Sequence, residues 1–126
     1  MRANKCKDTT PELTVRHMVH RLGYRYRLHD ADLPGKPDLV FPARRKIVFV
    51  HGCFWHQHEA VGCRGSRIPK TRVAYWQPKL ARNRLRDEQT IAQLTDLKWD
   101  VFVVWECWLK NLDQTANLLS VFLETP

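Results

Sequence analysis

A short, nearly continuous apolar run near the C-terminus most constrains the fold of this chain. Residues 100–105 read Asp-Val-Phe-Val-Val-Trp, and such a run is typical of a strand in a sheet that is covered on both faces. Residues 46–51, Lys-Ile-Val-Phe-Val-His, form the strongest predicted strand. A sheet covered on both faces needs apolar helix faces on each side, so the rest of the chain has to supply them.

The remaining periodic segments predict three helices and two shorter strands. The first helix begins near Thr9 in a capping box with Glu12 and ends at Gly23. The other elements are strands at 24–28 and 38–41, and helices at 71–97, interrupted or kinked near Pro78, and at 109–123. This order implies an α/β fold of three layers, with a mixed sheet between helices. The chain has 126 residues, so we expect one domain over 1–126, with residues 1–9 flexible.

The charge of the chain favours a polyanionic partner. Lys and Arg number 21 against 13 Asp and Glu, which gives a net charge of +8. Nucleic acid is the first such partner to consider. No apolar run approaches the ~20 residues that span a bilayer, and no secretory signal opens the chain. We therefore expect a cytoplasmic protein without membrane contact.

Six basic residues lie close together in and before the predicted helix at 71–97: Lys70, Arg72, Lys79, Arg82, Arg84 and Arg86. Contact with phosphate groups is the functional interpretation of this cluster. The alternative is an ordinary solvated helix face.

Cysteine and histidine residues are concentrated in an irregular, glycine-bearing segment at 52–72. Cys53, His58 and Cys63 follow one another at intervals of five residues, and Cys107 comes just after the predicted strand at 100–105. Thiolate and imidazole ligands of this kind can surround one tetrahedral Zn²⁺, which would hold the irregular segment in place. Without a secretory signal, cysteine beside histidine more often indicates a metal than a disulfide. The alternative is a set of free thiols and a surface histidine.

A second group of titratable residues lies at the ends of two predicted strands. Asp38 begins one strand and His51 ends its neighbour, so in a hairpin they converge at one edge of the sheet, close to His56. A carboxylate there can hold Mg²⁺, and an imidazole can take a proton from water or contact a phosphate. The alternative is an ordinary aspartate in a turn and a histidine satisfied at a strand end.

Four aromatic residues lie in loops and not in a helical or strand period. Phe54 and Trp55 follow Cys53 directly, and Tyr75 and Trp76 precede the basic helix. In a protein that binds nucleic acid, such side chains can wedge between bases. They can equally form a small core over a metal site.

These residues together resemble the very short patch repair endonucleases of bacteria. The resemblance rests on the run His-Gly-Cys-Phe-Trp-His at 51–56 and on Pro37-Asp38 before it. It covers nearly the whole chain and continues through residues 8–12, 33–38, 69–72, 75–76, 83, 86–87 and 104–107.

The resemblance implies a restriction-endonuclease-like fold and a Mg²⁺-dependent enzyme. Members of that family nick one strand of double-stranded DNA 5′ to the thymine of a T:G mismatch, which begins the repair of deaminated 5-methylcytosine. Structural Zn²⁺, mismatch-repair proteins, a repair polymerase and a monomeric state belong to the same expectation. The alternatives are a related nuclease of other specificity and a zinc-stapled DNA-binding module. The presence of Asp38, His51 and His56 together argues against the binding module, because a protein that only binds DNA needs none of them at one edge of the sheet.

Carried over by position, the resemblance assigns a role to each candidate residue. Asp38 would bind Mg²⁺ together with the backbone carbonyl of Val50, where many relatives have Thr. His56 would activate the attacking water, and His51 would contact the scissile phosphate or assist the leaving oxygen. Glu12 would sit near the site and support it through water or a second metal ion. The zinc ligands would be Cys53, His58, Cys63 and Cys107. The DNA contacts would be Phe54, Trp55, Trp76, Lys70, Arg72, Asn83 and Arg86.

Two further features of that family differ in this chain. The segment between His58 and Cys63 is longer than in the best-known members. Relatives also carry a basic segment before the position of Met1, and that segment helps to clamp DNA. We expect its absence to affect DNA affinity and mismatch selectivity but not the cutting centre.

Overall fold

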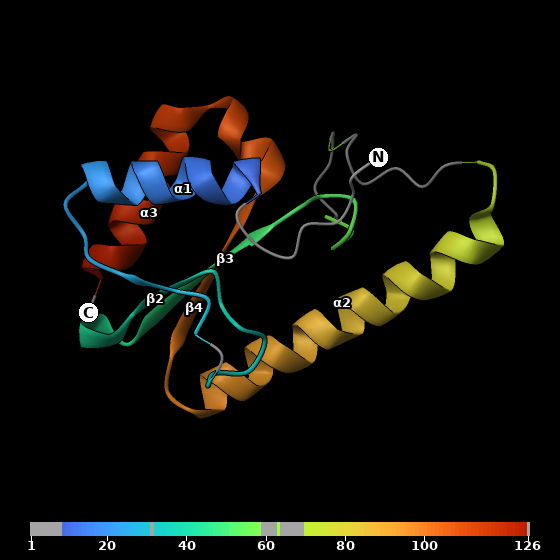
Figure 1. Ribbon diagram of the computed structural model, residues 1–126, viewed down its shortest axis with the longest axis horizontal. Coiled ribbons are helices and arrows are strands. Elements are labelled where there is room, and N and C mark those ends of the chain that lie inside the picture. Colours follow the sequence, from blue (N-terminus) through green and yellow to red (C-terminus); the bar gives the residue numbers. More distant parts are fainter. Residues whose placement is uncertain (1–8, 31, 59–62, 64–69, 126) are drawn as a thin grey trace.

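The computed structural model describes residues 9–30, 32–58, 63 and 70–125. Most of the residues predicted to be flexible (1–8), the segment 59–62 and the residues Asp8 and Pro69 of the resemblance lie outside the described part. The elements shown in Figure 1 are α1 (Thr10–Arg21), β1 (Arg27–Leu28), β2 (Leu39–Phe41), β3 (Lys46–His51), α2 (Val73–Asp96), β4 (Asp100–Trp105) and α3 (Leu112–Glu124). Two short 3-10 helices, η1 (Pro42–Arg44) and η3 (Glu106–Lys110), follow β2 and β4.

The four strands form one mixed sheet in the order β1-β2-β3-β4. β2 is antiparallel to both β1 and β3, whereas β3 and β4 run parallel, with His51 beside Trp105 at their ends. The long helix α2 is the crossover between these two parallel strands, as the geometry of a parallel pair requires. The predicted mixed sheet is confirmed.

Helices cover both faces of this sheet (Figure 1). On one face, apolar residues of α1 and α3 pack against alternate strand residues; this core contains Val15, Val19, Leu39, Phe41, Val48, Val104, Leu119 and Leu123. On the other face, Leu94 of α2 and Trp99 pack against Val40, Ile47 and Phe49. Neighbouring strand residues point to opposite faces, which is why an unbroken apolar run suits this position.

Three predicted elements differ from those observed. β1 contains only Arg27–Leu28 instead of residues 24–28, because β2 is itself only three residues long and offers a short ladder. Of the interruption or kink predicted near Pro78, the interruption is absent: α2 continues through this residue, which costs the helix one backbone hydrogen bond. α3 begins at Leu112 and not at Leu109, because η3 occupies the preceding residues.

The topology places the chemically interesting residues at one end of the sheet. His51 ends β3, the segment 52–58 follows it directly, and Cys107 comes just after β4. Asp38 immediately precedes β2, which is antiparallel to β3, so it lies at the same end. Within the described ranges, no helix combines the length and the apolar character that crossing a membrane requires.

Candidate active site and metal centre

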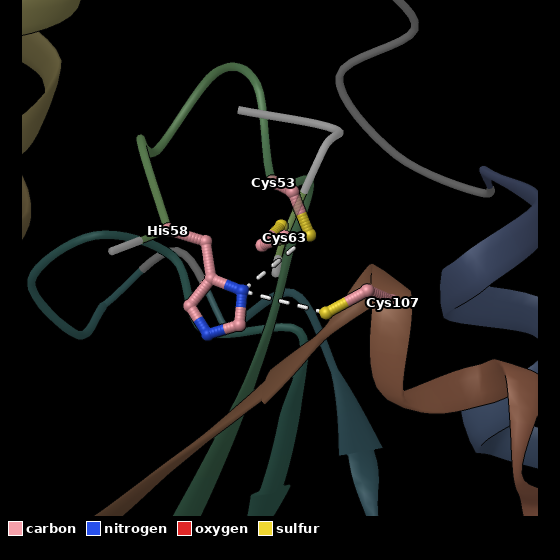
Figure 2. Close-up of side chains that lie close together, drawn as sticks. All are labelled: Cys53, His58, Cys63 and Cys107. Carbon is pink, nitrogen blue, oxygen red and sulfur yellow. Dashed lines mark hydrogen bonds between the residues drawn. The ribbon is translucent and has the colours of Figure 1, made fainter. Parts of the chain in front are cut away.

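Four side chains from the segment after β3 and from η3 meet in one group, which we call the Cys3His group: Cys53, His58, Cys63 and Cys107. Their ligand atoms all lie within 4.8 Å of one another. Figure 2 shows the three sulfur atoms and one ring nitrogen pointing toward a common centre. His58 Nδ1 lies 3.7 Å from Cys53 Sγ and 3.4 Å from Cys107 Sγ. A tetrahedral zinc ion holds sulfur and nitrogen ligands about 3.5–3.6 Å apart, so the group fits such an ion.

Burial keeps the side chains of the Cys3His group uncharged as long as no ion is bound. Burial raises the pKa of the Cys53 thiol to about 12 and also raises the pKa of Cys107, whereas burial lowers the pKa of His58. Neutral imidazole presents a lone pair to a metal, and a dication stabilises thiolates that burial alone would disfavour. The His58 ring stacks on the indole of Trp105, with centroids 4.1 Å apart and planes 9° apart, which fixes its orientation.

A second group brings together Glu12, His29 and Asp38, whose ligand atoms also lie within 4.8 Å of one another. Asp38 Oδ2 accepts a hydrogen bond of 2.6 Å from the backbone N–H of Val50 on β3. Burial raises the pKa of Asp38 to about 7, and the negative charge of Glu12 adds to this effect. Two carboxylates side by side, one buried and the other half-buried, are unfavourable unless a proton or a cation lies between them.

Glu12 is held in place by the cap of α1. Its backbone N–H donates to Thr9 Oγ1, and its Oε2 accepts from the N–H and the hydroxyl of Thr9, so the predicted capping box is confirmed. Its Oε1 lies 2.9 Å from His29 Nε2. Burial alone would raise the pKa of Glu12, but the hydrogen bonds from His29 and Thr9 outweigh burial, and the pKa is lowered. The two carboxylates therefore differ, with Asp38 the more easily protonated of the two.

A third group consists of His51, His56 and Asp87. The two imidazole rings stack with centroids 3.8 Å apart and planes 6° apart. His56 Nδ1 lies 2.5 Å from Asp87 Oδ2 on α2. Burial lowers the pKa of His51 to about 4, so its ring is neutral near pH 7. A pocket of about 390 Å³ opens beside these residues, between β3, β4 and α2.

The geometry of the third group suits proton transfer and not a shared metal ion. A ring nitrogen binds a metal in the plane of its ring, and the two nearly parallel planes of His51 and His56 do not meet at one ion. The hydrogen bond between His56 Nδ1 and Asp87 instead orients the ring. This leaves His56 Nε2 available to take a proton.

The aromatic residues named from the sequence also come together, although Tyr75 and Trp76 lie at the start of α2 and not in a loop as predicted. Phe54, Trp55 and Trp76 have centroid separations of 5.2 to 5.8 Å, and Tyr75 lies 4.9 Å from Trp76. We call these four residues the aromatic cluster. The Asn83 amide donates to the backbone carbonyl of Trp55 at 3.2 Å, which ties α2 to the segment after β3. The cationic residues Lys70, Arg72 and Arg86 are exposed.

The comparisons with known proteins agree with this geometry. Residues 1–61 match the profile of the family described as DNA mismatch endonuclease Vsr. The DNA mismatch endonuclease Vsr of Escherichia coli is 39% identical over 117 residues, which are 93% of this chain and 73% of that protein. This chain belongs to the Vsr family. The family is that of the very short patch repair endonucleases, so the resemblance noted in the sequence is confirmed.

Two further relatives of this Vsr chain are named as nicking enzymes. The type II nicking enzyme V.XorIIP of Xanthomonas oryzae pv. oryzae is 52% identical over 124 residues, which are 98% of this chain and 89% of that protein. The type II nicking enzyme V.NmeAIP of Neisseria meningitidis is 41% identical over 105 residues, or 83% and 73% of the two chains.

Sequence reasoning identified most members of the three groups but missed two. Asp87 was noted only as part of the resemblance, and its contact with His56 spans 31 positions. His29 lies just after the strand predicted at 24–28, and a continuation of the β1–β2 pairing sets it opposite Asp38. A histidine at the end of the strand that precedes the candidate metal ligand was the signal that could have found it.

Proposed function

We propose that this chain nicks one strand of double-stranded DNA 5′ to the thymine of a T:G mismatch, by Mg²⁺-dependent hydrolysis. The observation that carries the proposal is the assembly of a carboxylate pair, Glu12 and Asp38, and of an oriented histidine, His56, at one end of the sheet of a Vsr-family chain. The nick would begin very short patch repair of deaminated 5-methylcytosine. Mismatch-repair proteins and a repair polymerase would act with it in the bacterial cytoplasm.

The proposal includes the architecture in which this chemistry takes place. A mixed sheet between helices, with the catalytic groups at one end, supports a restriction-endonuclease-like fold. A single domain over residues 1–126 would act as a monomer. The substrate is asymmetric and only one of its strands is cut, so one active site is enough.

Oxygen atoms of Asp38, Glu12 and the Val50 backbone would hold the catalytic Mg²⁺. The carboxylates fit the preference of Mg²⁺ for oxygen ligands. In a strand, the N–H and the C=O of any one residue point toward the same neighbouring strand. The Val50 carbonyl therefore faces the side on which the Val50 N–H binds Asp38. Bound there, the ion would lower the pKa of a water molecule and offset charge on the phosphate.

The histidines of this chain would move the protons. His56, oriented by Asp87, would accept a proton from the attacking water through Nε2. His51 is neutral and buried beneath His56, and it would contact the scissile phosphate or assist the leaving oxygen.

Replacement Asp87→Asn is expected to lower kcat for nicking about 10- to 100-fold, because the ring of His56 loses the carboxylate that orients it. DNA affinity should stay within about twofold, since the change is confined to the catalytic group. Single-turnover nicking and DNA binding measure the two quantities. Glu88→Gln removes the same charge from the neighbouring, exposed position of α2 and is the control. Equal losses in both variants would show that only the net charge matters.

The remaining candidate residues would stabilise the site and bind DNA. The Cys3His group would hold a structural Zn²⁺ beside the catalytic end of the sheet. Phe54, Trp55 and Trp76 would form the wedge that opens the duplex beside the mismatch. Lys70, Arg72, Asn83 and Arg86 would contact the DNA.

A nicking assay tests the proposed function directly. One end-labelled duplex carries a T:G mismatch and a second is fully paired, and both are incubated with Mg²⁺ and then with EDTA. We expect a Mg²⁺-dependent nick in the thymine strand of the mismatched duplex alone. Cutting of both duplexes would instead indicate a nuclease of other specificity. Binding without cutting would indicate a zinc-stapled DNA-binding module.

A further inference from the structure

We infer that His29 is a positioning residue of the catalytic metal site, where its imidazole holds the carboxylate of Glu12 beside Asp38. This inference rests on the proposed function, because it takes Glu12 and Asp38 as the residues that hold the divalent ion.

The sheet itself brings His29 to the site. β1 pairs with β2 through Leu28 and Leu39, and one step further along this ladder His29 stands opposite Asp38. The backbone N–H of His29 donates to the carbonyl of Asp38 at 3.4 Å. The φ angle of His29 is 45°, in the left-handed region that few residues other than glycine adopt. Such a conformation persists only where the surrounding structure holds it.

The side-chain contacts of His29 single out Glu12. Nε2 lies 2.9 Å from Glu12 Oε1 but 4.0 Å from Asp38 Oδ1, so the hydrogen bond goes to Glu12. The other oxygen of Glu12, Oε2, accepts from Thr9. Both oxygens of this buried carboxylate are therefore tied, one by the helix cap and one by His29. The two ties set the direction in which Glu12 faces Asp38.

This arrangement has a measurable consequence for metal binding. A carboxylate that is free to rotate loses part of its metal affinity, and loss of a partner that orients a metal ligand commonly costs 10- to 100-fold. Without His29, Oε1 of Glu12 would lose its 2.9 Å hydrogen bond, whereas the contact of Oε2 with Thr9 and the longer approach of Arg16, at 3.8 Å, would stay. We expect a weaker metal site in an otherwise intact fold.

Two substitutions separate this role from a purely structural one. In His29→Asn, the new side chain tolerates a positive φ but is too short to reach Glu12. In His29→Gln, the longer amide can still donate to Glu12 Oε1. His17→Ala removes an exposed histidine of α1 and is the matched control.

The probe is Mn²⁺, whose binding to the full chain is followed by electron paramagnetic resonance. We expect the dissociation constant for Mn²⁺ to rise about tenfold in His29→Asn and to return to within about threefold of the wild-type value in His29→Gln. His17→Ala should leave it unchanged, and near-ultraviolet circular dichroism should show the same fold in all variants. In nicking assays, the Mg²⁺ concentration for half-maximal rate should rise in the same order, without a change in KM for DNA.

The outcomes distinguish this inference from the proposed function. If Asp38→Ala loses Mn²⁺ binding while His29→Asn binds as the wild type does, the role of His29 is wrong and the metal site stands. Equal weakening in His29→Asn and His29→Gln would likewise overturn the inference, because the hydrogen bond would then not matter. If Asp38→Ala binds Mn²⁺ as tightly as the wild type, the proposed metal site itself is wrong.

Discussion

Asp38→Ala is expected to lower the rate of nicking by about a thousandfold or more. A divalent ion contributes several kcal/mol to stabilising the reacting phosphate, and each 1.4 kcal/mol is about a factor of ten in rate. The Val50 N–H holds Asp38 against β3, and the substitution leaves Glu12 as the one carboxylate of this group. Nicking of a T:G duplex at saturating Mg²⁺ measures the loss. Asp96→Ala, which removes an exposed carboxylate at the end of α2, is the control and should cut normally.

The same substitution is expected to leave the fold intact and to change how its stability depends on pH. Burial and the charge of Glu12 raise the pKa of Asp38 to about 7. The metal-free wild type should therefore lose stability as the pH rises from the ordinary pKa of an aspartate to about 7, and then level off. Asp38→Ala should lack this loss and be the more stable protein at pH 8. Thermal unfolding of both proteins in EDTA at pH 5 and pH 8 tests this, and parallel curves would contradict the assignment.

The Mg²⁺ concentration that the wild type needs for nicking should depend on the protonation of the same carboxyl group. Below pH 7 a proton competes with the ion for Asp38, so the Mg²⁺ concentration for half-maximal nicking should rise up to about tenfold for each pH unit. Above pH 7 it should be nearly constant. A half-maximal concentration that is constant from pH 6 to pH 8 would show that Asp38 is not the group that binds the ion.

Cys107→Ala is expected to abolish the proposed zinc binding and to destabilise the fold by about 3 kcal/mol or more, which corresponds to a fall in Tm of roughly 10 °C. Cys107 follows β4 and Cys53 follows β3, so an ion held by both ties the ends of two neighbouring strands to the irregular segment. Elemental analysis of the purified protein and thermal unfolding measure the two effects.

A matched variant shows whether the effect belongs to the thiol. Lys110→Ala changes an exposed residue of the same 3-10 helix and should keep one zinc ion per chain and the wild-type Tm. One zinc ion per chain and an unchanged Tm in Cys107→Ala would contradict the ligand set. Loss of zinc without loss of stability would show that the ion does not hold the fold together.

Local patterns in the sequence predicted the elements that depend on near neighbours. The capping box of Thr9 and Glu12 begins α1 where it was expected, since a cap is made within four residues. β3 and β4 occupy the predicted residues, because an unbroken apolar run suits a strand with helices on both faces. The elements whose limits depend on their partners were less well predicted. The predicted first strand was too long because the length of β1 is set by its pairing with β2. An interruption or a kink was predicted near Pro78, and the interruption is absent because one lost hydrogen bond does not end a 24-residue helix.

The sequence by itself pointed to most of the proposed zinc ligands and to the proposed catalytic histidines, because Cys53, His58, His51 and His56 lie within a few positions of one another in an unusual run. Only the tertiary structure decided which groups orient them. Asp87 reaches His56 because α2 packs along the sheet between β3 and β4, and His29 reaches Glu12 because the β1–β2 ladder brings its strand back to Asp38. These partners lie 31 and 17 positions apart, and contacts at such separations depend on strand register and helix packing, which no local pattern encodes.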